Sequence, residues 1–169
     1  MAYYSELKYL PTHSEGVWNT EPDFILWEDE DTGYLCCINR NIYLFLNGYV
    51  GVPNTHPETN KKVEEFEDGI LSKIITWSDS TLPCTLPMEL LKNQGKVLPD
   101  IDNHWFIGFD CSQDRDYIPG EMGGFAEAIN HLFYTPSTYQ EEYKNVVYVT
   151  QEIEKLVKYL KEAEDACLP

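Results

Sequence analysis

Near the end of the chain, the apolar positions follow the clearest pattern in the sequence. They recur at helical spacing and fall on one helix face: Val149, Ile153, Leu156, Val157 and Leu160. Thr150 is of a type that suits a helix N-cap. The pattern predicts a helix over residues 149–165 that packs its apolar stripe against a sheet.

Two nearly continuous apolar runs lie earlier in the chain, at residues 34–38 and 42–46. Runs of this length and composition are typical of strands, and the polar triplet 39–41 between them predicts a tight hairpin turn. Because both runs are apolar at almost every position, we expect the hairpin to be covered on both faces of its sheet.

The other predicted elements are shorter. Strands are indicated at residues 70–77 and 105–110, which are rich in β-branched and aromatic residues. Short helices are indicated at residues 61–67, 88–92, 125–133 and 139–144. Residues 1–33 are polar and broken by prolines and a glycine, which predicts an irregular N-terminal arm, and Trp18 with the apolar run at 24–27 indicates one short strand or a packed arm within it. A chain of 169 residues fits a single domain. We therefore expect one α+β domain, a mainly antiparallel sheet packed by the C-terminal helix.

The charge is strongly unbalanced, with 29 acidic residues against 12 Lys and Arg and a net charge of −17. Such a surface repels nucleic acid and anionic membranes, which predicts neither direct nucleic-acid binding nor membrane binding. It suits a basic protein partner, although an acidic surface can also serve solubility alone. The acids that could meet a basic partner lie in three places: Glu28, Asp29, Glu30 and Asp31, then Glu64, Glu65, Glu67 and Asp68, and then Asp114 and Asp116 within residues 110–116.

Five cysteines, two of them adjacent, show neither a disulfide framework nor the spacing of a zinc site. Reduced thiols fit a cytosol. The N-terminal residues lack the basic start and apolar run of a signal peptide, and the apolar runs are too short for a membrane span. These features predict a cytoplasmic protein.

Residues 104–116 combine a predicted strand with a cluster of reactive side chains at its end. Asp110, Cys111, Asp114 and Asp116 follow an aromatic run. Clustered carboxylates could bind a divalent cation or perform acid–base chemistry. Cys111 could be a nucleophile with His104 or His56 as its base. The alternatives are an acidic loop with Arg115 as its counter-ion and a cysteine that only fills the core.

His56 is the second candidate for chemistry. It lies between Thr55 and Pro57, in a segment with glycines and prolines. A histidine in such a loop can act as a base or a metal ligand, and the acids at 64–68 follow it. The alternative is a histidine that only caps the loop. The sequence has neither a phosphate-binding loop nor a dinucleotide fingerprint, and it has no hydrolase or zinc-protease motif.

Three segments carry a resemblance to small proteins that are common in phages and prophages. They are Leu-Asn-Gly-Tyr-Val-Gly-Val-Pro-Asn-Thr-His-Pro at 46–57, Trp-Phe-Ile-Gly-Phe-Asp-Cys at 105–111, and Tyr-Val-x-x-Glu at 148–152. Their order is similar to that of the family over about residues 34–165. The resemblance implies a phage-type accessory protein that acts in the cytoplasm of the host bacterial cell, with His56, Asp110 and Cys111 as the matched polar positions.

The chain departs from that family in two segments. Asp68 stands before Gly69 where the family pattern has a histidine, and Ser112-Gln113 stands where it has Ala-His. These changes weaken the expectation of a shared catalytic role. A binder that inhibits a host factor, as an anti-CRISPR or other anti-defence protein with a nucleic-acid-mimicking surface, is the first hypothesis. A divalent-metal-dependent hydrolase or nuclease-like enzyme using His56 and the 110–116 cluster is the second.

Overall fold

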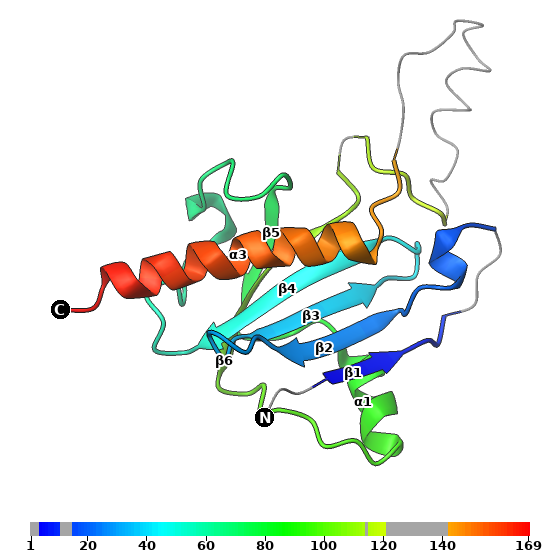
Figure 1. The fold of residues 1–169 in the computed structure, drawn as a ribbon, viewed down its shortest axis with the longest axis horizontal. Coiled ribbons are helices and arrows are strands. Elements are labelled where there is room, and N and C mark those ends of the chain that lie inside the picture. The colour runs from blue at the N-terminus through cyan, green and yellow to red at the C-terminus, as the bar shows by residue number, and fades with distance from the viewer. Residues whose placement is uncertain (1–3, 11–14, 114, 121–141) are drawn as a thin grey trace, which may run out of the picture.

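A computed structural model of the chain describes residues 4–10, 15–113, 115–120 and 142–169. Its centre is a six-stranded sheet in the order β1-β2-β3-β4-β6-β5, and every neighbouring pair is antiparallel (Figure 1). The strands are β1 Tyr4–Leu7, β2 Phe24–Glu28, β3 Leu35–Arg40, β4 Leu46–Pro53, β5 Ile75–Asp79 and β6 His104–Asp110. The helices are η1 Val17–Asn19, η2 Val63–Glu65, α1 Thr85–Asn93 and α3 Val146–Ala166. The predicted α+β class is confirmed.

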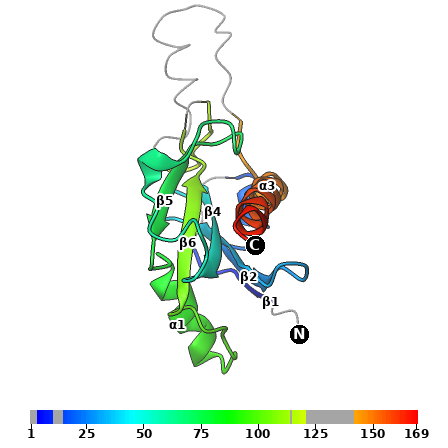
Figure 2. The ribbon, with the colours of Figure 1, turned by 90° about the vertical axis from the view of Figure 1, so that its left-hand side faces the viewer.

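The C-terminal helix α3 covers one face of the sheet, mainly over β4 and β3 (Figures 1 and 2). Its predicted stripe is buried at Val149, Ile153, Leu156 and Leu160. The helix begins three residues earlier than expected because Asn145 is the N-cap, its side chain accepting from the Tyr148 N–H at 2.9 Å. The Thr150 hydroxyl instead donates to the Val146 carbonyl inside the helix. The predicted cap was therefore wrong.

The opposite face of the sheet packs against α1 (Figure 2). Met88 and Leu91 of α1 join a second buried cluster with Leu26, Cys37 and Phe106 from the strands. Alternate residues of β2 and β3 therefore enter different cores, as the two-residue period of a strand requires. This explains why these strands read as continuous apolar runs, and it confirms that both faces are covered.

The predicted hairpin turn at residues 39–41 was wrong. Asn39 and Arg40 lie inside β3, paired with β4, and the turn occupies residues 41–45. Arg40 looked like a turn residue because it is charged, yet its side chain is fully buried. It tolerates burial because Asp23 accepts its Nε–H at 2.9 Å and Glu21 accepts from Nη2 at 3.1 Å.

Residues 4–10 and 15–33, the described part of the N-terminal arm, are more regular than their composition indicated. They supply strands β1 and β2, which pair with each other and extend the sheet beyond β3. The strand predicted at 70–77 is β5, which begins later, at Ile75. The helix predicted at 61–67 is only the three-residue η2, and the helix predicted at 88–92 is part of the longer α1. The helix predicted at 125–133 lies outside the described residues. So does most of the one at 139–144, whose described residues 142–144 are not helical.

Strands β4 and β6 interlock through glycines that face aromatic rings. Gly48 pairs with Phe109, and Gly108 pairs with Tyr49. A Cβ atom on Gly108 would lie 2.4 Å from the Tyr49 ring and 2.6 Å from the Gly48 carbonyl oxygen. The missing side chains therefore let two aromatic rings lie across the strands, which accounts for the Gly-Tyr-Val-Gly and Ile-Gly-Phe segments as packing features.

Candidate functional site

The end of β6, where the sequence placed its acidic cluster, is a closed turn. Asp110 accepts from the Ser112 N–H at 3.0 Å and from its hydroxyl at 2.7 Å. The Gln113 amide pairs with the backbone of Ile74, accepting from its N–H at 2.8 Å and donating to its carbonyl at 2.9 Å. The Gln113 contacts hold the turn against the segment that precedes β5, and the Asp110 contacts stabilise the turn itself. Both side chains therefore have a structural role.

Asp116 is an internal counter-ion and not a surface acid. Its side chain is buried and forms an ion pair with Lys73, which is also buried, and it accepts from the Gln113 N–H at 3.0 Å. Burial raises the pKa of Asp116 above the ordinary aspartate value, although the Lys73 ammonium opposes the shift. The sequence had suggested Arg115 as the counter-ion of this acidic loop. For Asp116 the positively charged partner is Lys73. Asp114 lies outside the described residues.

Cys111 belongs to the core beneath α3. Its side chain is buried, and its N–H donates to the Leu46 carbonyl at 2.9 Å. Burial, with a smaller contribution from Asp116, raises the pKa of the thiol far above its usual value. The thiolate that a nucleophile needs is therefore strongly disfavoured.

The burial of Cys111 predicts which thiols react in the native protein. Cys36, Cys37, Cys84 and Cys111 are buried, whereas Cys167 is exposed. Brief alkylation with iodoacetamide at neutral pH should modify Cys167 alone, and all five cysteines should react in denaturant. Peptide mass spectrometry reads the sites directly. Rapid native modification of Cys111 would contradict its assignment to the core and restore it as a candidate nucleophile.

His56 joins the loop after β4 to the C-terminal helix. Its ring is buried; Nδ1 accepts from the Glu58 N–H at 3.1 Å, and Nε2 lies 3.0 Å from the Leu160 carbonyl oxygen. This pattern requires the proton on Nε2, which donates to Leu160. The Tyr34 ring meets it edge-on, with 5.7 Å between ring centroids. Both ring nitrogens are thus engaged within the fold.

The sheet register separates the residues that the enzyme hypothesis would combine. Asn47 of β4 pairs with Asp110, and Pro53 pairs with His104 at the opposite end of β6. His56 follows Pro53, so it lies about six residues along the strand from Asp110, roughly 20 Å at about 3.3 Å per residue. Within the described ranges, no three His, Cys, Asp or Glu side chains are arranged to hold a metal ion.

Comparison with known proteins found no relative of this chain. Neither a protein-family model, nor a curated protein, nor a solved structure matches the chain. The resemblance to phage proteins therefore stays a prediction, and function has to be argued from the site. In the part of the chain that the structure describes, no helix has the length and apolar character needed to cross a membrane.

The first acidic run forms the connection between β2 and β3. Glu28 ends β2, and Asp29 is occupied in the turn, where it accepts from the Thr32 hydroxyl at 2.6 Å and from its N–H at 3.0 Å. Glu30 and Asp31 at the tip are exposed, and among the described residues neither side chain has an ion-pair or hydrogen-bond partner. The tip thus presents two unneutralised carboxylates on a well-formed turn.

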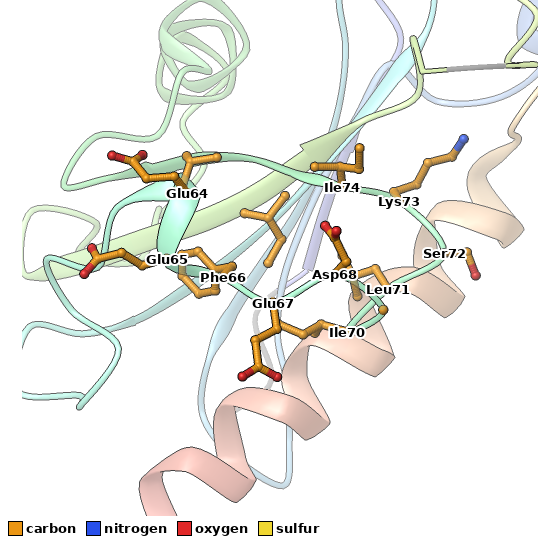
Figure 3. A pocket seen from close by; sticks show the side chains of 13 residues that line it. Glu64, Glu65, Phe66, Glu67, Asp68, Ile70, Leu71, Ser72, Lys73 and Ile74 are labelled. Carbon is orange, nitrogen blue, oxygen red and sulfur yellow. The ribbon is translucent and has the colours of Figure 1, made fainter.

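The second acidic run begins in η2 and continues into the segment before β5, and residues 63–75 line an open pocket of about 700 Å³ (Figure 3). Glu65 is occupied, accepting from the Lys62 N–H at 2.6 Å. Glu64, Glu67 and Asp68 are exposed and have no ion-pair partner within the described ranges. Figure 3 shows Glu64 and Glu65 extending away from α3, and Glu67 lying nearer to it.

Both acidic segments are attached to α3. The Tyr34 hydroxyl beside the first run donates to Glu164 at 3.0 Å. The second run is bound by Ser72, whose N–H donates to Glu152 at 2.7 Å, and by the apolar side chains of Phe66 and Ile70. Helix α3 therefore lies between two acidic segments that are far apart in the sequence.

Helix α3 adds acids that the sequence interpretation did not single out. Glu154 and Glu162 are exposed on it, and Glu164 and Asp165 near its end pair with Lys161. The signal was present, because acids fall at positions outside the apolar stripe of the predicted helix. What the sequence could not give was their position beside the two acidic segments.

Proposed function

We propose that this chain is a phage-type accessory protein that binds and inhibits a basic host protein. The target class that fits is a nucleic-acid-binding defence protein, such as a CRISPR effector nuclease. The observation that carries the proposal is the set of exposed, unneutralised carboxylates on both sides of α3: Glu30, Asp31, Glu64, Glu67 and Asp68. In a chain of net charge −17, they create a negative field beside α3.

The mechanism is electrostatic competition. A channel that binds nucleic acid is lined with Lys and Arg that neutralise phosphates. Carboxylates held on rigid turns can occupy the same cations without ordering a flexible chain, which favours binding. The hairpin tip is held by the Asp29–Thr32 contacts, and the second segment is held by Ser72–Glu152. The engagement of His56 and Cys111 within the fold favours this function over catalysis.

Affinity capture from a bacterial host lysate at low and high salt tests the proposal. The tagged chain should retain a basic, nucleic-acid-binding protein at low salt and release it at high salt, because salt screens the ionic contacts. Failure to recover any basic partner at low salt would contradict the proposal.

A further inference from the structure

A groove lies between α3 and the β2–β3 connection. It has a volume of about 400 Å³. Its apolar walls include the cross-strand pair Trp27 and Cys36 from the sheet and Ile153 and Val157 from α3. Trp27 is only partly buried, although it packs against the core cluster. The Trp27 indole is therefore accessible from the groove and is held in place by the core beneath it.

The rim of the groove is charged and incompletely neutralised. Asp31 and Glu154 are exposed lining residues, and neither has an ion-pair partner in the described part of the chain. Lys158 lies 3.9 Å from Glu162, and Lys161 pairs with Asp165 at 2.7 Å. The two lysines of the groove thus have acids of their own, while Asp31 and Glu154 retain unmatched negative charge.

We propose that this groove takes an arginine side chain of the basic partner protein, an inference that rests on the proposed function. A guanidinium can stack its plane on the Trp27 indole while its N–H groups donate to a carboxylate, and its methylene stem suits the apolar walls. A lysine ammonium offers a point charge without the planar face. The groove therefore selects arginine over lysine, whereas the outer acids attract any cation.

Titration of the full chain with hexa-arginine or hexalysine, followed by ¹H–¹⁵N NMR, tests the assignment. The Trp27 indole signal is identified by its loss in Trp27→Phe. It should shift saturably with hexa-arginine and less with hexalysine. Asp31→Asn with Glu154→Gln should weaken hexa-arginine binding about fivefold, through loss of two ionic contacts. The control pair Glu15→Gln with Glu89→Gln, two exposed positions outside the proposed surface, changes the net charge equally and should alter binding by less than about twofold.

Three results would overturn arginine binding in the groove, and they can be distinguished from failure of the proposed function. Equal weakening in both variants with an unmoved Trp27 signal would overturn the groove and leave charge-driven binding in place. A Trp27 shift that depends on protein concentration alone would assign the groove to a second copy of the chain and overturn the proposal. Absence of any peptide binding would also overturn it, while recovery of the natural partner from the lysate judges the proposed function separately.

Discussion

Replacing Asp23 with alanine is expected to lower the free energy of unfolding by about 3–5 kcal/mol. The Asp23 carboxylate is fully buried and accepts four hydrogen bonds: from the Tyr9 N–H at 2.7 Å, the Leu10 N–H at 2.8 Å, Lys8 Nζ at 2.8 Å and Arg40 Nε at 2.9 Å. Without it, the fully buried Arg40 charge loses a fully buried partner. Urea unfolding followed by circular dichroism measures the change.

Lys8→Ala is the matched control for that experiment, because Lys8 contacts the same carboxylate from the surface. Its side chain is 38% exposed, so its ion pair is screened by water and should contribute only about 0–1 kcal/mol. Equal losses in the two variants would show that Arg40 does not depend on Asp23 and would contradict the buried pair as the basis of this part of the fold.

The same carboxylate gives stability a pH dependence. Burial alone would raise the pKa of Asp23, but hydrogen bonds from Leu10, Lys8 and Tyr9 outweigh it and lower the pKa below the ordinary value of 3.8. A depressed folded-state pKa means that the contribution is complete above the unfolded value and is lost as pH falls through the folded value. Acidification below about pH 4 should therefore destabilise the wild type more steeply than Asp23→Asn.

Leu156→Ala is the second large effect, expected to lower the free energy of unfolding by about 2–5 kcal/mol. Leu156 is fully buried between α3 and the sheet, and its truncation leaves a cavity in the main core. Val147→Ala on the same helix is the control, because Val147 is 64% exposed and should change stability by at most about 0.5 kcal/mol. A loss at Leu156 no larger than that at Val147 would contradict the packing of α3 on the sheet.

Periodicity alone was enough to predict α3, because its four buried apolar residues repeat at helical spacing along one face. Arg40 was misplaced for a reason that local sequence could not reveal. The partner that makes its burial tolerable, Asp23, lies 17 residues earlier and becomes adjacent only when β2 pairs with β3. In the N-terminal arm, the strand indicated at 24–27 is β2, and β1 was missed because polar residues dominate the composition around it.

The candidate chemical residues were identified by type, but type does not show whether a side chain is already occupied. His56 meets the Leu160 carbonyl across 104 positions of sequence, and Asp116 meets Lys73 across 43. These long-range partners engage both side chains within the fold. Glu30 and Asp31 lie on an exposed turn, as the charge pattern predicted, because like charges in a dense run favour solvation.

The most direct test of the central claim is the affinity of the chain for the captured partner after equal charge changes at two surfaces. One variant combines Glu64→Gln, Glu67→Gln and Asp68→Asn, and its control combines Glu15→Gln, Glu89→Gln and Asp102→Asn, all exposed positions. The dissociation constant of each complex is measured across salt concentrations.

We predict that the first variant binds about tenfold more weakly with a shallower salt dependence. The control should bind within about twofold of the wild type, and the wild-type chain should displace nucleic acid from the partner. Equal affinities and salt dependences for the two variants, or simultaneous binding of the chain and nucleic acid to the partner, would contradict the account.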